Sequence, residues 1–222
     1  MQLILLNPNT SESTTQAMLK IAQEAANGGA TVEGWTAGFG APLILNEAAL
    51  AIAAEAVFSL RDAVRQRNPA GVIVAAFGDP GQALLAAGLP CAVTGIAEAG
   101  MAEAAEGGRR FAVVTTTPDL VAAITRTAER YGHGALFLGV RLTPDDPREL
   151  MADSGRLEEA LFRACKAAMH DDGAEAIVIG GGPLAVAARA LNGRLPVPII
   201  EPIPAAVKLA IRRAGQSKVQ GR

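Results

Sequence analysis

The sequence is poor in aromatic residues and in cysteine. Aromatic side chains make up only 4% of the 222 residues, although half of the chain is hydrophobic. Ala, Val, Ile and Leu must therefore build the core, which is typical of helices packed on a mostly parallel sheet. Two separated cysteines and no export signal favour the cytoplasm, and we expect Cys91 and Cys165 to be small buried hydrophobic residues.

An excess of charge and a long apolar run are also absent. The 20 basic and 22 acidic residues give a net charge of −2 without a basic block, which gives little support to nucleic-acid binding. Glutamates interrupt the alanine-rich stretches, which argues against a membrane span. The apolar N-terminus is too short for a signal peptide and predicts a first strand. We expect a small-molecule ligand and neither a nucleic acid nor a membrane as partner.

Aliphatic runs typical of strands alternate with helical patterns along the chain. Strands are predicted at 3–6, 31–36, 72–75, 91–93, 111–114, 136–140, 176–179 and 197–200. The longer helices are predicted at 11–27, 46–67, 118–131 and 157–169, with a last helix after residue 202. This alternation predicts an α/β fold of parallel strands with right-handed helical crossovers.

The two halves of the chain repeat one plan. A polar turn follows the first strand of each half at 7–11 and 115–118, and a second turn follows at 76–80 and 181–183. We therefore expect an internal duplication with two pseudo-symmetric lobes, each a mostly parallel sheet flanked by helices. Residues 1–96 with 205–222 would form one lobe and residues 97–204 the other. Because ligands bind beyond the carboxyl ends of parallel strands, the four turns predict one cleft between the lobes.

The turn from Asn7 to Ser11 concentrates amide and hydroxyl groups where a strand ends and a helix begins. Backbone N–H groups at a helix N-terminus favour an anion, and these side chains add further donors. A helix cap would need only Asn9 or Ser11, so the surplus favours ligand binding. Thr115 to Thr117 have the same position in the second half, where strand ending and capping are a stronger alternative.

Two further turns carry candidate residues. Asp79, in Phe77-Gly-Asp-Pro-Gly81, is expected to cap the helix that follows it; as a base it would be poor, because backbone N–H donors lower a carboxyl pKa. Gly180 to Gly182 permit close approach of a ligand to the backbone but resemble a phosphate loop only weakly. Glu201 follows the last strand, where it faces the cleft or marks a helix start.

The histidines do not predict a metal site. His133 lies in a loop and His170 follows a helix, and neither has a second histidine or cysteine at ligand spacing. A Ser-His-Asp set cannot be assembled from these positions.

Together these motifs resemble the aspartate/glutamate/hydantoin racemase superfamily, in particular its hydantoin and allantoin racemases. The similar pieces are the turns at 7–11 and 77–81, the strand end at 113–116, the strand into Gly180 and the closing segment 200–202. The resemblance spans nearly the whole chain. It implies two pseudo-symmetric α/β lobes, no cofactor, and an assembly of identical subunits.

The resemblance also implies that two thiols of the family are replaced. Family members move a proton between two cysteines, one from each lobe, since a modest shift brings a thiol pKa near neutrality. Ala76 and Gly181 occupy those two positions here, and Cys91 and Cys165 lie elsewhere in the pattern. The ligand-binding residues that carry over are Asn7, Asn9, Thr10, Ser11, Phe77, Gly78, Thr115, Thr116, Gly180, Gly181 and Gly182.

Three functions fit this pattern. The first is a cofactor-independent isomerase of the racemase type that acts on a small hydantoin-, ureido- or amino-acid-type substrate by a non-cysteine route. Asp79, Thr116 or water would then carry the proton. The second is a lyase or hydrolase on the same scaffold, with water positioned by Asp79 or Glu201. The third is a small-molecule-binding protein without catalysis.

Overall fold

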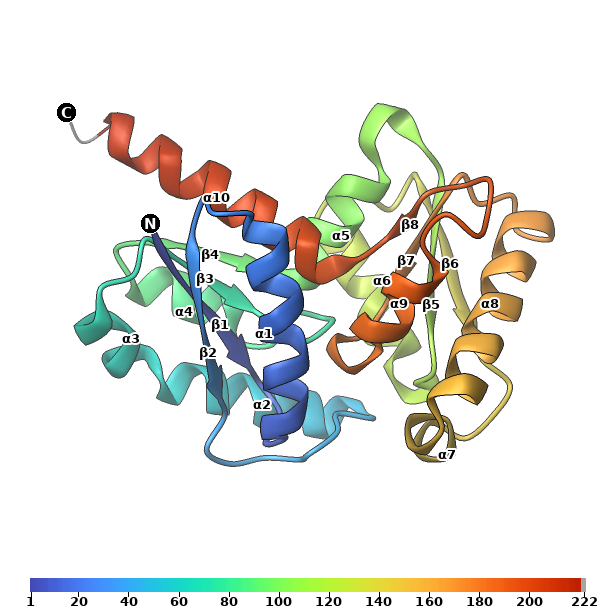
Figure 1. Cartoon of the computed structure of the whole chain (residues 1–222), viewed down its shortest axis with the longest axis horizontal. Coiled ribbons are helices and arrows are strands. Elements are labelled where there is room, and N and C mark those ends of the chain that lie inside the picture. Colours follow the sequence, from blue (N-terminus) through green and yellow to red (C-terminus); the bar gives the residue numbers. More distant parts are fainter. Residues whose placement is uncertain (221–222) are drawn as a thin grey trace.

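The computed structural model describes the backbone of residues 1–220 and the side chains of residues 1–216. It contains two four-stranded sheets, and every strand pair in them is parallel (Figure 1). The first sheet, in the order β2-β1-β3-β4, contains β1 (Gln2–Asn7), β2 (Thr31–Thr36), β3 (Gly71–Val74) and β4 (Ala92–Gly95). The second sheet, in the order β6-β5-β7-β8, contains β5 (Phe111–Thr115), β6 (Phe137–Leu142), β7 (Ala176–Ile179) and β8 (Ile199–Ile200). The same strand order in both halves confirms the predicted α/β fold of two similar lobes.

Helices flank both sheets. The first half contains α1 (Glu12–Ala26), α2 (Glu47–Ser59), α3 (Arg61–Arg67), α4 (Gln82–Gly88) and α5 (Ile96–Ala104). The second half contains α6 (Val121–Arg130), α7 (Pro147–Ala152), α8 (Ser154–His170), α9 (Ala185–Leu191) and α10 (Pro202–Gln220). Short 3-10 turns lie at Glu106–Gly108, Pro118–Leu120 and Gly182–Leu184. No helix within residues 1–220 combines the length and the apolar character that a membrane crossing requires.

The predicted helix 46–67 is wrong in one respect, because it consists of two helices that meet at Leu60. Asn46 does cap the first of them, by accepting from the backbone N–H of Ala49. At the junction the hydroxyl of Ser59 donates to the carbonyl of Ala56, and the N–H of Leu60 turns to Val57. These bonds compete with the regular helical ladder and interrupt it. The helix α7 was also missed, because no helix was predicted between residues 140 and 157.

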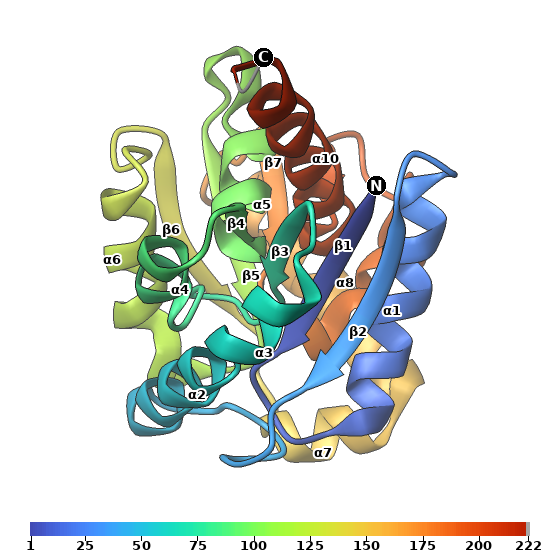
Figure 2. The ribbon, with the colours of Figure 1, turned by 90° about the vertical axis from the view of Figure 1, so that its left-hand side faces the viewer.

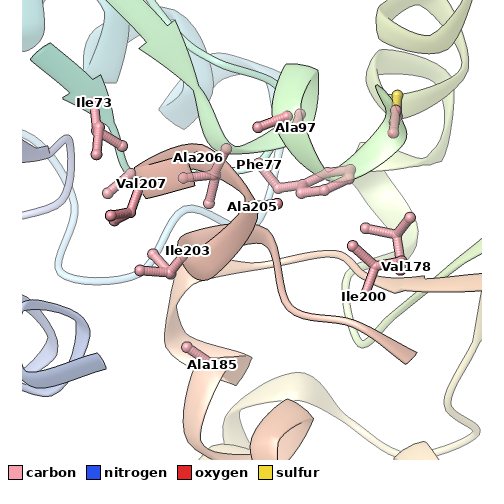
Figure 3. Close-up of a cluster of buried hydrophobic side chains, with 14 of the residues drawn as sticks. Ile73, Phe77, Ala97, Val178, Ala185, Ile200, Ile203, Ala205, Ala206 and Val207 are labelled. Atoms are coloured by element: carbon pink, nitrogen blue, oxygen red, sulfur yellow. The ribbon is translucent and has the colours of Figure 1, made fainter. Parts of the chain in front are cut away.

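The terminal helix α10 returns to the first lobe. With α1 it covers one face of the first sheet, whereas α2, α3 and α4 lie against the other face (Figure 2). Figure 3 shows Ile203, Ala206 and Val207 of this helix among buried side chains that include Ile73 of β3 and Val178 of β7. One apolar cluster therefore joins the two sheets, and it fixes how the lobes face each other.

The lobes meet most closely where β3 and β7 end. A Cβ atom added to Gly182, just beyond β7, would lie 2.7 Å from the carbonyl oxygen of Ala75 and 2.7 Å from the sulfur of Met18. Both of these atoms belong to the first lobe. Glycine at position 182 thus lets the two strand-end turns approach each other.

We expect Gly182→Ala to lower the free energy of unfolding by about 1–3 kcal/mol, because the added methyl group must separate the lobes or distort the turn. Gly38→Ala is the control, since a Cβ there meets no atom within 4 Å. Urea denaturation of both variants provides the measurement. A Gly182→Ala variant as stable as Gly38→Ala would show that the lobes do not meet as described.

Candidate functional site

A cavity lies between the lobes, at the carboxyl ends of the central strands. Its empty volume is ≈ 580 Å³, which includes the space at its mouth that is open to solvent. The first lobe lines it with Asn9, Leu43, Ile44, Leu45, Ala76 and Phe77. The second lobe lines it with Thr115, Thr116, Thr117, Leu120, Ile124, Met151, Gly180, Gly181, Gly182, Pro183 and Leu184. The turns that the sequence analysis expected around one cleft each contribute at least one residue to it.

Only Asn9 of the first polar turn lines the cavity. Asn7 is fully buried, and its side-chain amide nitrogen donates to the side-chain oxygen of Asn9, to the carbonyl of Ser11 and to the hydroxyl of Thr15. Its own side-chain oxygen accepts from the backbone N–H of Asn9. Asn7 therefore holds the turn. The side-chain NH₂ of Asn9 has no partner among the described residues, so it can donate to a ligand.

Two other residues predicted from this turn lie outside the cavity lining. Ser11 caps α1, where its hydroxyl accepts from the N–H of Thr14. The backbone N–H of Thr10 donates to the carbonyl of Ala41 and so fixes the loop that leads to Leu43. Gly78, in the second turn, is likewise not part of the cavity wall.

The second lobe supplies hydroxyl and backbone donors. Thr115 is tied to the protein, because its hydroxyl donates to the carbonyl of Gly180 at 2.7 Å. The hydroxyl of Thr116 has no partner within the described residues although the residue is 4% exposed. The backbone N–H groups of Thr116 and Gly181 are also unused there. These donors suit a carbonyl or carboxylate oxygen of a ligand.

The two residues that the resemblance predicts at the positions of the family thiols line this same cavity. Ala76 comes from the first lobe and Gly181 from the second. A Cβ at Gly181 would meet only Leu184, at 3.3 Å, although the backbone there has φ +156°. No cysteine lines the wall: Cys165 is buried in the core of the second lobe, and Cys91 packs beside β4. Desolvation by burial raises the pKa of both thiols, as in unreactive cysteines.

Sequence reasoning missed the apolar side of the cavity. Its members lie in a loop, at helix starts and near the end of α7: Leu43, Ile44, Leu45, Leu120, Ile124, Leu184 and Met151. The run from Leu43 to Leu45 is a signal that could have been noticed, since three large apolar residues are unusual in a glycine-containing loop. Met151 had no such signal, because α7 itself was not predicted.

Asp79 does not line the cavity, and two expectations about it are wrong. Its carboxylate accepts from the backbone N–H groups of Ala97 and Glu98 at 2.9 and 2.8 Å. It therefore caps α5, whereas the helix that directly follows it, α4, starts at Gly81. Desolvation by burial outweighs these donors and raises the pKa of Asp79 to about 6, where the sequence predicted a lowered value.

The remaining candidates also lie elsewhere. Glu201 is bound to Arg189, whose guanidinium also pairs with Glu24 of α1. His133 packs edge-on against Phe111, with ring centroids 6.0 Å apart, and burial lowers the pKa of its imidazole. His170 ends α8. Among the described residues no group of His, Cys, Asp and Glu side chains could hold a metal ion.

Comparison with known proteins establishes the family. The model of the Asp/Glu/hydantoin racemase family matches residues 3–210, so the chain belongs to this family. A hydantoin racemase of Paenarthrobacter aurescens is 26% identical over 211 residues, which cover 95% of this chain and 89% of that protein.

Two solved structures share the whole fold. The allantoin racemase from Klebsiella pneumoniae superimposes with a TM-score of 0.91 and 30% identity, covering 100% of this chain and 89% of that one. The allantoin racemase from Pseudomonas fluorescens has a TM-score of 0.89 and 29% identity, covering 99% and 91%. The chain is thus built on the scaffold of hydantoin and allantoin racemases, as the motifs predicted.

The raised pKa of Asp79 predicts a pH-dependent stability. The folded state holds this proton up to about pH 6, whereas the unfolded chain releases it near pH 3.8. The contribution of Asp79 to the free energy of unfolding is therefore highest below about pH 4, falls as the pH rises, and is about 3 kcal/mol lower above about pH 6. Asp79→Asn should remove this fall.

The measurement is urea denaturation of wild type and Asp79→Asn at several pH values, compared as a difference so that other titrating groups cancel. Asp119→Asn is the control, since Asp119 is exposed. Parallel pH profiles for wild type and Asp79→Asn would contradict the prediction.

Proposed function

We propose that the protein is a cofactor-independent isomerase of the racemase type, which acts on a small hydantoin-, ureido- or amino-acid-type substrate by a non-cysteine route. The observation that carries this proposal is that one cavity contains Ala76 and Gly181 from opposite lobes. This supports the view that the cavity is the place of the family chemistry, with Ala76 and Gly181 at the positions that the resemblance assigns to the two thiols.

Donors in the cavity support an enolate mechanism. Removing the proton next to a carbonyl leaves negative charge on its oxygen, and preorganised N–H groups stabilise such a charge. The free donors of Asn9, Thr116 and Gly181 supply that function. A water molecule held by the Thr116 hydroxyl would carry the proton, because no carboxylate lines the wall.

The apolar side of the cavity supports a substrate with an apolar substituent. Leu120, Ile124 and Met151 of the second lobe face a site that Leu43 to Leu45 of the first lobe also line. Among the described residues no charged side chain lines the cavity, so a neutral ring with an alkyl or aryl group suits it better than a charged substituent. A hydantoin with such a substituent fits this pattern.

Small-molecule binding without catalysis is the second candidate. It is favoured by a specific observation: none of the lining side chains titrates near neutral pH. A lyase or hydrolase in which Asp79 or Glu201 positions water has less support, because Asp79 binds α5 and Glu201 binds Arg189.

The decisive experiment follows L-5-benzylhydantoin, allantoin, L-aspartate and L-glutamate in D₂O by polarimetry and proton NMR. An isomerase exchanges the proton on the stereogenic carbon and loses optical rotation. Thermal-shift measurements with the same compounds run in parallel. Stabilisation by a ligand without exchange would favour the binding protein, and the absence of both would contradict the proposal.

Restoring the thiols provides a gain-of-function prediction. We expect Ala76→Cys/Gly181→Cys to raise the rate of racemisation of a bound hydantoin by about 100-fold or more, as positioned acid–base groups do. The matched control is Ala76→Ser/Gly181→Ser, which adds side chains of similar size without an acidic thiol. Equal rates for the two double variants would argue against a racemase geometry in this cavity. Circular dichroism must first show that both variants fold, because φ at Gly181 is +156°.

A further inference from the structure

A partly buried polar cluster joins the lobes beside the cavity. Its members are Asp79 of the first lobe, Gln82 at the start of α4 and Tyr131 at the end of α6 in the second lobe. The phenol oxygen of Tyr131 lies 2.8 Å from Oδ2 of Asp79 and 2.5 Å from Oε1 of Gln82. Asp79 is 3% exposed and has φ +53°, which is rare for a residue with a side chain. The fold thus keeps this carboxyl group in place at a conformational cost.

The cluster contains one hydrogen too few if Asp79 is ionised. The phenol of Tyr131 has a single hydrogen, yet its oxygen contacts two acceptor oxygens. Reversing the amide of Gln82 does not help, because its Nε2 already donates to the carbonyl of Val93 and to Glu98. A hydrogen on Oδ2 of Asp79 satisfies every member: Asp79 donates to Tyr131, and Tyr131 donates to Gln82.

Within residues 1–216 no positively charged side chain contacts the carboxyl group of Asp79. From α5, Glu98 contributes negative charge, and its carboxylate is held by Arg213 of α10. From α6, the guanidinium of Arg130 lies over the ring of Tyr131 and donates to the carbonyl of Gly78. His133 follows in the next loop.

The other neighbours of the turn are apolar or lack a side chain. Leu50, Ala54 and Val57 of α2 lie next to Gly78 and Gly81. A Cβ at Gly95 would overlap the carboxyl group of Asp79, so glycine there makes room for it.

We propose that Asp79 is a positioning residue that fixes the cavity-lining turn against the second lobe through a proton on its own carboxyl group, donated to Tyr131. Ala76 and Phe77, which line the cavity, lie three and two residues before Asp79 in the same turn. Loss of the proton leaves Tyr131 with one hydrogen for two acceptors, so the link between the lobes loosens as the pH rises. The raised pKa of Asp79, about 6, agrees with this assignment.

The single tyrosine of the chain makes the proposal testable without a substrate. Wild-type protein labelled with 13C at the phenol carbon of tyrosine gives one NMR signal, which is followed from about pH 4 to about pH 8. We expect a single titration step near pH 6 that disappears in Asp79→Asn. The step should persist in His133→Asn and in Asp119→Asn, which separates Asp79 from the nearby imidazole and from exposed carboxyl groups.

The behaviour of the tyrosine titration step in the two variants decides whether the proposal holds. A step that persists in Asp79→Asn, or that disappears in His133→Asn, overturns the proposal. If Asp79→Asn does not fold, the titration of Asp79 is measured directly in the wild-type protein, from the 13C signal of its carboxyl group. A midpoint near pH 6 then supports the proposal, and a midpoint at the ordinary value of about pH 4 overturns it.

The role of Asp79 in holding the turn is tested separately, by amide hydrogen exchange. Below about pH 6, where Asp79 holds its proton, amide hydrogen exchange in residues 76–82 should be about tenfold faster in Tyr131→Phe, as expected for the loss of one hydrogen bond. Exchange in β1 should stay unchanged. Unchanged exchange in the turn overturns the positioning role. Neither readout requires turnover, so a negative result here leaves the proposed isomerase untouched, and an inactive protein leaves this proposal untouched.

Discussion

The close contact between the ends of β3 and β7 determines the architecture of the site. Gly182 lies against the carbonyl of Ala75, and a side chain at position 182 would push the lobes apart. Because the sheets are parallel and in the same strand order, this one contact brings the carboxyl ends of four central strands around a shared space. Helix α10 reinforces it by packing Ile203 and Val207 into the cluster that joins the sheets.

The residues that line this cavity are suited to binding a ligand, because they supply hydrogen-bond donors and apolar contacts. Its donors are one side-chain amide, one hydroxyl and main-chain N–H groups, and its remaining wall is apolar. Such a wall strengthens each hydrogen bond to a ligand oxygen by excluding water. Asp79, two residues beyond Phe77 of this wall, is turned toward α5 and Tyr131. The proposed reaction would therefore depend on stabilising charge on the ligand.

The sequence predicted the architecture better than the roles of single residues. Aliphatic strands separated by capped helices depend on local patterns, and both sheets were foreseen along with the convergence of the four turns. The roles of Asn7 and Asp79 were not, because each depends on partners distant in the chain or on complete desolvation. Asp79 bonds to Ala97 and Tyr131, and no local pattern reports that these residues come together.

The apolar residues of the cavity wall show a second limit of prediction from sequence. Met151 lies on a six-residue helix that was not predicted, and Leu43 to Leu45 lie in a loop. Hydrophobic periodicity identifies helices and strands that face a core, but it is silent for apolar residues in irregular segments that face a ligand. These residues became visible only when both lobes were assembled around the cavity.

The central claim is that a small guest occupies the space between the lobes, and methionine methyl NMR tests it most directly. Met151 lines the cavity, whereas Met101 is buried on α5 and Met169 packs behind the second sheet. On titration with L-5-benzylhydantoin, the account predicts a shift of the 13C-methyl signal of Met151 while those of Met101 and Met169 stay in place. A shift of Met101 or Met169 without one at Met151, or saturation by other ligands that never affects Met151, would contradict it.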